Sequence, residues 1–204
     1  MDINTLTIGF ARRAATYKRA QLIFKDVDRL IDIGKGKIQI IFSGKAHPKD
    51  EGGKSLIKNI VKSSKYFTGH IKIIYLENYN MWLGRLITSG VDVWLNTPLR
   101  PNEASGTSGM KASLNGVPNL SVLDGWWSEG CIDGVNGWAV GNPNEISDES
   151  DADHLYNLIE NNVIPSYYGD KDDWSTMMKE SIKTGISYTS HRMVTDYNNQ
   201  YYKL

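Results

Sequence analysis

Four runs rich in apolar residues alternate with helical patterns in the first half of the chain, and this alternation restricts the fold more than any other feature. The runs lie at residues 5–10, 38–42, 71–76 and 91–95. A strand that is apolar on both faces has to be covered on both sides, as happens in parallel sheets whose connecting helices pack on the two faces. The sequence therefore predicts an α/β fold with a doubly wound, Rossmann-like parallel sheet.

The connecting helices are predicted from apolar residues at helical spacing. They are expected at residues 23–31, at 49–64 with Ile57, Ile60 and Val61 facing inward, and at 82–89. Beyond residue 95 a turn-rich loop (97–109) leads into a short helix at 107–115 and a further strand at 120–123. Residues 126–142 are interpreted as an ordered loop. C-terminal helices are predicted from residue 151 onward.

Size and composition are those of one globular domain. The chain has 204 residues, 40% of them hydrophobic, with no internal repeat or linker. We therefore expect a single domain over residues 1–204, with a helical part from about residue 148. The lone Cys131 is expected to be a buried or half-buried thiol. No apolar run reaches the roughly 18 to 20 residues that cross a bilayer and no signal peptide is evident, so we expect a cytoplasmic protein without a membrane partner.

Charge is distributed unevenly although the net charge is zero. Residues 1–102 carry 17 basic and 8 acidic side chains, a net charge of +9, and the remaining residues carry the opposite excess. Neutrality argues against a nucleic-acid partner, whereas the basic half is suited to a compact anion such as phosphate. The alternative is that lysine-decorated, solvated helices account for the excess. The acidic half is expected to consist mostly of solvated helices.

The first motif is a cluster of four cations at residues 11–19 (ARRAATYKR), where the first strand is expected to pass into a helix. A helix N-terminus already carries about half a positive charge, so cations placed there are unfavourable unless they bind an anion. The cluster favours a phosphate site. The alternative is a solvated helix start.

The second motif places small residues before a lysine, at residues 103–111 (EASGTSGMK). Small residues let the backbone approach a ligand, and amides and hydroxyls can hold a phosphate. Lys111 is expected in the first helical turn, where Met110 and Leu114 would desolvate it and favour Schiff-base chemistry. This combination points to pyridoxal phosphate. A flexible glycine-serine loop followed by a solvated lysine remains the alternative on this segment alone.

Three further side chains are candidates with an equally good structural interpretation. His47 follows a strand end and is suited to contact a ligand or to bond the loop backbone. Trp126 and Trp127 are suited to stack on a sugar ring or to pack in the core. The histidines show no metal-ligand spacing, so no metal site is predicted.

Six segments, in order along the chain, together resemble the C-terminal half of an α-glucan (glycogen, starch or maltodextrin) phosphorylase of the shorter bacterial and archaeal type. They are residues 11–19 (ARRAATYKR), 44–48 (GKAHP), 77–81 (ENYNM), 91–98 (VDVWLNTP), 103–111 (EASGTSGMK) and 123–130 (LDGWWSEG). The resemblance implies one half of a two-domain glycosyltransferase-B fold. Its N-terminal glucan-binding domain is then absent from this chain, and its active site lies between the halves.

The resemblance also assigns site residues. Lys111 matches the lysine that forms the Schiff base with pyridoxal phosphate, and it counts with Arg13 and Lys18 as catalytic. Cofactor contacts are implied at Lys111, Thr107, Ser108, Gly109, Arg12, Lys18 and Tyr79. Substrate contacts are implied at Glu103, Ser105 and Gly106 for the glucosyl hydroxyls and at Arg13 for phosphate, with His47 as a further candidate.

Two positions depart from the muscle-type pattern. Arg12 stands where that type has a lysine, which conserves the charge but not the geometry. Asn80 replaces an arginine, which removes one phosphate contact.

The implied reaction is the phosphorolysis of terminal α-1,4-glucosyl units with retention, releasing glucose 1-phosphate, with the cofactor phosphate as proton donor and acceptor. The implied partners are the glucan, inorganic phosphate, the missing N-terminal domain and a second copy of the chain that covers exposed apolar surface. The isolated chain is expected to turn over glucan poorly or not at all. The alternatives are a retaining nucleotide-sugar glycosyltransferase of the glycogen-synthase type, which typically has an acidic residue at the position of Lys111, and a non-catalytic carbohydrate-binding remnant.

Overall fold

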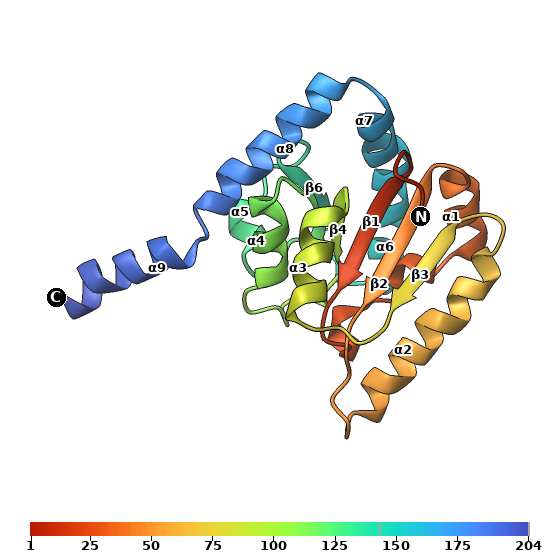
Figure 1. The fold of residues 1–204 in the computed structure, drawn as a ribbon, viewed down its shortest axis with the longest axis horizontal. Helices are drawn as coiled ribbons and strands as arrows, with labels where there is room; N and C mark the ends of the chain where they lie inside the picture. The colour runs from red at the N-terminus through yellow and green to blue at the C-terminus, as the bar shows by residue number, and fades with distance from the viewer. Residues whose placement is uncertain (143, 204) are drawn as a thin grey trace.

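The computed structural model, which describes residues 1–142 and 144–203, contains six parallel strands in one sheet flanked by helices (Figure 1). The strands are β1 (Leu6–Ala11), β2 (Ile38–Ser43), β3 (Lys72–Leu76), β4 (Val93–Asn96), β5 (Asn119–Val122) and β6 (Gly137–Val140). Their spatial order is β3-β2-β1-β4-β5-β6, so the direction of winding reverses between β1 and β4. The predicted doubly wound, Rossmann-like parallel sheet is confirmed. In such sheets, ligands bind at the carboxyl ends of the strands beside the reversal.

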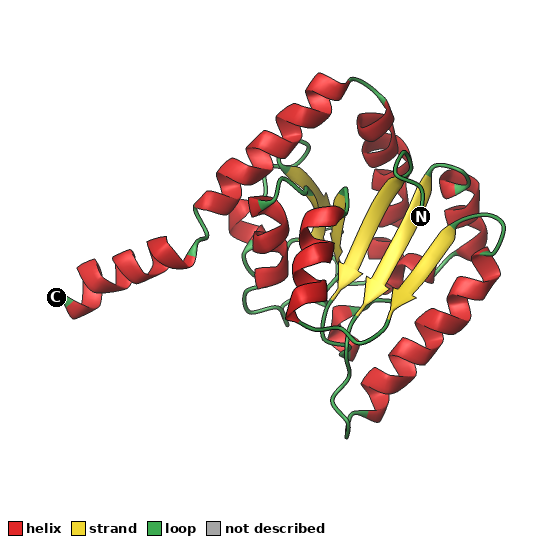
Figure 2. Cartoon of the chain, viewed as in Figure 1, coloured by secondary structure: helices red, strands yellow, loops and turns green. Residues whose placement is uncertain are grey.

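Alternate residues of the central strands face two separate apolar cores. Leu6, Ile8 and Phe10 belong to the larger cluster of buried side chains, and Ala11 belongs to the smaller one. Helices α1 (Val27–Gly34), α2 (Glu51–Ser64) and α6 (Asp148–Leu158) cover the larger cluster, whereas α3 (Met81–Gly90) and α4 (Thr107–Leu114) cover the smaller one (Figure 2). The sheet is therefore buried on both faces, as its apolar strands require.

Four of these five helices begin with a side-chain cap. Asp26, Asp50, Asn80 and Ser147 each accept a hydrogen bond from a backbone N–H in the first turn that follows. Helix α4 differs, because it is preceded by Gly106 in the left-handed conformation (φ 82) and no side chain caps it. A helix start without a side-chain cap leaves N–H groups to be satisfied by water or a ligand.

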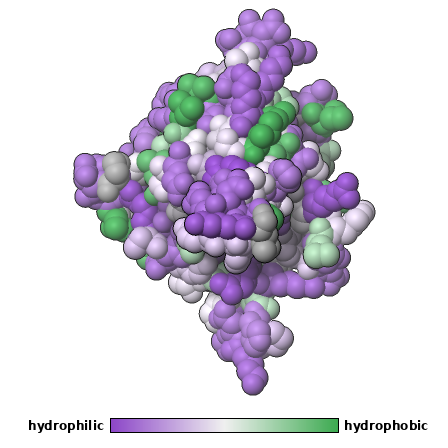
Figure 3. Space-filling model, turned by 90° about the vertical axis from the view of Figure 1, so that its left-hand side faces the viewer, coloured by the Kyte–Doolittle hydropathy of each residue, from purple (hydrophilic) through white to green (hydrophobic). Residues whose placement is uncertain are grey.

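The remaining elements complete the chain. They are η1 (Thr16–Lys18), η2 (Leu22–Phe24), η3 (Lys65–Phe67), α5 (Trp127–Gly130), η4 (Ile159–Val163), α7 (Ile164–Tyr168), α8 (Lys171–Ile186), α9 (Ser190–Tyr197) and η5 (Asn198–Tyr202). Helix α9 projects from the body, and Figure 3 shows apolar patches separated by hydrophilic surface on this side. Within the described part of the chain, no helix combines the length and apolarity that a membrane span needs.

Three details of the expected architecture are wrong. Residues 126–142 are not a loop, since they contain α5 and the edge strand β6. Val61 is exposed rather than inward, because α2 buries only a narrow stripe centred on Ile60. No α-helix begins directly after β1: the chain passes through the 3-10 turns η1 and η2 before α1 begins at Val27, so the argument from a helix N-terminus does not apply to the four cations.

Candidate functional site

An open cavity of about 450 Å³ lies at the carboxyl edge of the sheet, beside the point where the winding reverses. Two loops form most of its wall: the segment after β1, with Arg12, Arg13 and Lys18, and the segment between β4 and α4. Tyr79, from the loop after β3, and Lys111, from α4, complete it. The topology thus brings together the two motifs, which lie about ninety residues apart in the sequence.

A carboxylate shared by two cations lies in this cavity wall. Glu103 Oε2 lies 2.8 Å from Arg12 Nη2 and also contacts Lys18 Nζ, and each of these side chains is at most 7% exposed. Arg12 Nη1 donates a second hydrogen bond to Asn96 Oδ1 at the end of β4. Buried charges are costly unless they are paired, so this arrangement fixes all three side chains.

The loop that carries Glu103 is fixed to the loop after β5. The Glu103 backbone N–H donates to Asp124 Oδ2 (2.9 Å), and the Trp126 N–H donates to the Ser105 carbonyl (2.9 Å). Gly125 has a positive φ of 56 and lies so close that a Cβ there would be 2.6 Å from the same carbonyl oxygen. The segment from Glu103 to Gly106 is therefore held on both sides before α4 begins.

The start of α4 presents small residues to the cavity. Gly106 and Thr107 line it, and Ser108 Oγ is buried without a hydrogen-bond partner among the described residues. Gly109 does not line it. A Cβ at Gly109 would be 2.6 Å from Asn119 Oδ1, and its N–H already donates to the Gly106 carbonyl, so this glycine serves the packing of α4.

Lys111 is solvent-exposed and lines the cavity. The expectation that neighbouring side chains desolvate its amine is therefore wrong. Lys111 is the fifth residue of α4, in the second turn rather than the first. Leu114 is itself 39% exposed and Met110 is only partly buried, so neither covers the amine. Lys111 also borders a second cavity of about 530 Å³ between α3 and α4, together with Tyr79 and Ser108. The amine thus stands where two cavities meet.

Two tyrosines flank the cations. Burial raises the pKa of Tyr79, against the opposing effect of Arg12. Burial also acts to raise the pKa of Tyr17, but hydrogen bonding and charge from Lys18, with a contribution from Arg13, outweigh it and lower the pKa. The Lys18 amine lies 4.5 Å from the centre of the Tyr17 ring. The pKa of each phenol is therefore influenced by cations that line the cavity, Tyr79 by Arg12 and Tyr17 by Lys18 and Arg13.

The remaining sequence candidates fall into two groups. Arg13, Ser105 and Gly106 line the cavity, and the Arg13 side chain is exposed. His47 lies in the exposed loop between β2 and α2, outside the set of residues that line the cavity, and its Nδ1 accepts from the Lys49 N–H. Arg19 faces away from the cavity toward α6, so it does not belong with the other three cations of its motif.

Three residues that contact the site residues were not predicted from the sequence. They are Asn96, which accepts from Arg12, Asp124, whose carboxylate accepts from the Glu103 N–H, and Tyr17, whose ring lies beside Lys18. A signal exists only for Asn96, a polar residue that ends a buried strand beside the reversal point. The tryptophan pair is buried, with its rings 5.1 Å apart, so it packs in the core and is not a sugar platform. Among the described residues, no group of three or more His, Cys, Asp or Glu side chains could hold a metal ion.

Cations beside a helix start without a side-chain cap, at the reversal point of a doubly wound sheet, are typical of α/β domains that bind phosphate groups. A comparison with known families identifies the family of this domain. Residues 10–129 match the family model described as carbohydrate phosphorylase. The chain belongs to the carbohydrate phosphorylase family, as its motifs predicted.

Curated relatives match almost the whole chain. The maltodextrin phosphorylase of Thermococcus litoralis is 51% identical over 99% of this chain and 25% of its own length. The glycogen phosphorylase of Aquifex aeolicus is 48% identical over 99% of this chain and 31% of its own length, and that of Mycobacterium tuberculosis is 44% identical over 98% and 25%. The chain therefore spans between a quarter and a third of the length of these relatives.

Proposed function

We propose that this chain is the cofactor- and phosphate-binding domain of a cytoplasmic α-glucan phosphorylase. Such an enzyme uses pyridoxal phosphate and inorganic phosphate to release glucose 1-phosphate from an α-1,4-glucan. The observation that carries the proposal is that Arg12, Arg13 and Lys18 line one cavity with Lys111. An anion site and a free amine at one place meet the two requirements of a phosphorylated aldehyde cofactor.

The residues at the start of α4 fit that cofactor. Lys111 would attach it through the exposed amine, and the first turn of α4 with Thr107 and Ser108 would hold its phosphate. The buried, unpartnered Ser108 Oγ supports this fit, since such a group normally finds a hydrogen-bond partner. When bound, the cofactor supplies a phosphate that gives and takes a proton.

The chain's own side chains provide the charge that two phosphates require. Arg13 and Lys18 bind the substrate phosphate, and Arg12 faces the cofactor phosphate. Like charges repel strongly in a partly dehydrated site unless cations compensate them. Glu103, Ser105 and Gly106 hold the glucosyl hydroxyls. Because Glu103 already contacts Arg12 and Lys18, it links the sugar position to the phosphate position.

The glucan site requires the part of the relatives that this chain does not span. We propose that an N-terminal domain of that kind supplies most glucan contacts, and that the 204-residue chain alone turns over glucan poorly or not at all.

Cofactor binding is the first test. Pyridoxal phosphate added to the chain is expected to give a bound absorbance band that resists gel filtration and is missing from Lys111→Ala. Lys58→Ala, which removes another exposed lysine, on α2, is the matched control. Addition of the N-terminal portion of a related phosphorylase is expected to restore glucose 1-phosphate release, in wild type but not in Lys111→Ala. Binding of a nucleotide sugar without any cofactor band would contradict the proposal and favour a glycosyltransferase of the glycogen-synthase type.

A further inference from the structure

Arg19 has an unusual backbone conformation directly after Lys18. Its φ and ψ are 46° and 43°, in the left-handed region. A non-glycine residue rarely stays in this region unless its surroundings hold it there, and such residues gather near functional sites. The conformation turns the Arg19 side chain away from the cavity while Lys18 reaches Glu103.

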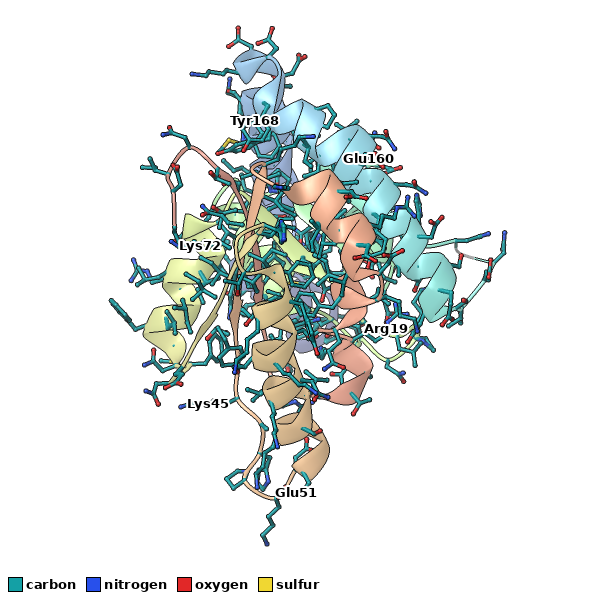
Figure 4. All side chains as sticks on the ribbon, turned by 90° about the vertical axis from the view of Figure 1, so that its right-hand side faces the viewer. Arg19, Lys45, Glu51, Lys72, Glu160 and Tyr168 are labelled. Atoms are coloured by element: carbon teal, nitrogen blue, oxygen red, sulfur yellow. The ribbon has the colours of Figure 1, made fainter. Side chains whose placement is uncertain are left out.

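All three guanidinium nitrogens of Arg19 are bound, and its side chain is only 7% exposed. Nε donates to the Thr97 carbonyl (3.0 Å), and Nη2 donates to the Pro98 carbonyl (2.9 Å). Nη1 donates to Asp148 Oδ1 (2.8 Å), and Nη2 also donates to Asp151 Oδ2 (2.6 Å). The guanidinium thus joins the loop after β4 to the first turn of α6. Figure 4 shows Arg19 beside that end of α6.

Backbone contacts reinforce the same junction. Thr97 Oγ1 is within hydrogen-bond distance of the carbonyls of Lys18 (3.3 Å) and Arg19 (3.1 Å). The Leu99 N–H donates to the Tyr17 carbonyl (2.7 Å). Residues 17–19 and 97–99 are therefore one connected unit. Lys18 belongs to this unit, and the loop from 97 continues into Glu103.

Asp151 supplies the charge that holds this unit. Its side chain is 1% exposed, and it sits under Gly141, where any Cβ would collide with its carboxylate. Oδ2 binds Arg19, whereas Oδ1 has no hydrogen-bond partner among the described residues and lies 3.8 Å from Arg100 Nη2. Two arginines therefore compensate this buried carboxylate, and Asp151 does not line the cavity.

We propose that Asp151 is a positioning residue: through Arg19 it holds Lys18 and the loop of Glu103 in the geometry that pairs them at the cavity. The role of that geometry in phosphate binding rests on the proposed function. The coupling between Asp151 and Lys18 does not depend on it. Loss of the Asp151 charge leaves Arg19 with one buried partner fewer and releases the left-handed turn.

The test measures the reactivity of individual lysines in the full chain by brief acetylation and mass spectrometry. Lys18 is buried against Glu103 and is expected to react far more slowly than the exposed Lys58. In Asp151→Asn, which keeps the side-chain size, Lys18 is expected to react about tenfold faster, because removal of one member of a buried ion pair favours local opening. Lys58 is expected to react at the wild-type rate.

A matched control lies in the same turn of α6. Glu149→Gln removes the same charge, but Glu149 is 76% exposed and pairs with Lys25, so only Lys25 is expected to change. Asp148→Asn removes the second, 49% exposed partner of Arg19 and is expected to raise the Lys18 rate by about threefold, since exposed pairs contribute less. If Asp151→Asn does not fold, Asp148→Asn tests in its place whether the acidic partners of Arg19 hold Lys18 in its buried position.

Two results would overturn the proposal. One is an unchanged Lys18 rate in a variant that melts like wild type. The other is an equal rise at every lysine, which indicates general destabilisation. Protection of wild-type Lys18 by inorganic phosphate tests the proposed function separately. If phosphate gives no protection while Asp151→Asn still exposes Lys18, the phosphate assignment fails and the positioning role stands.

Discussion

Glu103 is the residue at which the charges of the site meet. Its carboxylate is shared by Arg12 and Lys18, and all three side chains are buried. Within this group one positive charge remains uncompensated, and a buried cation without a counter-ion is costly. This excess positive charge favours an anionic ligand beside the three side chains, whereas the Glu103 carboxylate limits how strongly the two cations bind that ligand. In the proposed phosphate site, Glu103 therefore limits the affinity of the cavity for an anion, in addition to any contact with a sugar.

Cys131 is a half-buried thiol whose surroundings are expected to suppress its reactivity. Burial, with a smaller effect of the Asp133 charge, raises the pKa of the Cys131 thiol to about 12 from an ordinary 9.0. Because the thiolate is the reactive form, alkylation by iodoacetamide at pH 8 is expected to be about a thousandfold slower in the folded chain than in the unfolded chain. The rate is expected to rise with pH up to the raised pKa.

Asp133→Asn is the matched variant for this prediction. It removes the smaller cause of the shift, so it is expected to speed alkylation of the folded chain slightly. A folded chain that reacts as fast as the unfolded one would show that the thiol is not desolvated.

Residue identities in the cavity could be read from the sequence, but their pairing could not. The cation cluster and the glycine-serine-lysine segment marked Arg12, Arg13, Lys18 and Lys111, and the structure brings all four to one cavity. Arg19 looked like a fifth member of that set. Its partners Asp148 and Asp151 lie 129 and 132 positions away, a separation at which no local pattern signals a contact.

At the scale of elements, the strands with long apolar runs were predicted and the short edge strand was not. Strand β6 has four residues and begins at Gly137, which has a φ of 151 and packs against β5 where a Cβ would collide with the Asn119 carbonyl. Glycine and tryptophan in a turn-rich segment are typical of a loop. Burial of Trp127 and Trp138 makes the segment part of the fold, and burial is decided by tertiary packing.

Helix α4 depends on a glycine for its close approach to the loop after β5. A Cβ at Gly109 would be 2.6 Å from Asn119 Oδ1 and 2.8 Å from Trp126 Nε1. Gly109→Ala is therefore expected to lower the free energy of unfolding by about 1–3 kcal/mol, as overpacking of a tight interior does. Urea-induced unfolding followed by tryptophan fluorescence measures the change.

Gly90→Ala is the matched control for this prediction. Gly90 also lies in a helix, at the end of α3, and a Cβ there would meet no atom of the described residues within 4 Å. Its substitution is expected to be neutral or slightly stabilising, because alanine favours the helix. Equal effects of the two substitutions would contradict a packing role for Gly109.

For the whole molecule, the opposite charges of the two halves of the chain are partly matched within the fold. Cations of the first half pair with the start of α6: Arg19 with Asp148 and Asp151, Lys25 with Glu149, and Arg29 with Asp153. Asp148, Glu149 and Asp153 are exposed, as expected of the acidic half, and Asp151 is the exception, because it is buried against Arg19. The charge excess of the first half divides between this interface, the cavity and the exposed lysines of α2.

The projecting segment after Tyr188 is expected to contribute nothing to the stability of this domain. Over residues 190–203, α9 and η5 have no buried residue and extend from the body (Figure 1). Removal of everything after Tyr188 is therefore expected to leave the melting temperature within about 2 °C of wild type, because little surface is exposed on truncation. It is also expected to reduce self-association measured by light scattering, since it removes exposed apolar side chains such as Val194 and Tyr201.

Tyr188 itself has to be kept in this truncation, because its ring packs edge-on against Trp126 at 5.0 Å. Tyr188→Ala in the full chain is expected to lower the melting temperature by several degrees, since it removes an aromatic contact with a buried side chain. The two variants together locate the boundary between the packed domain and the projecting segment. If truncation after Tyr188 lowers the melting temperature as much as Tyr188→Ala does, α9 stabilises the domain and is more than a projecting arm.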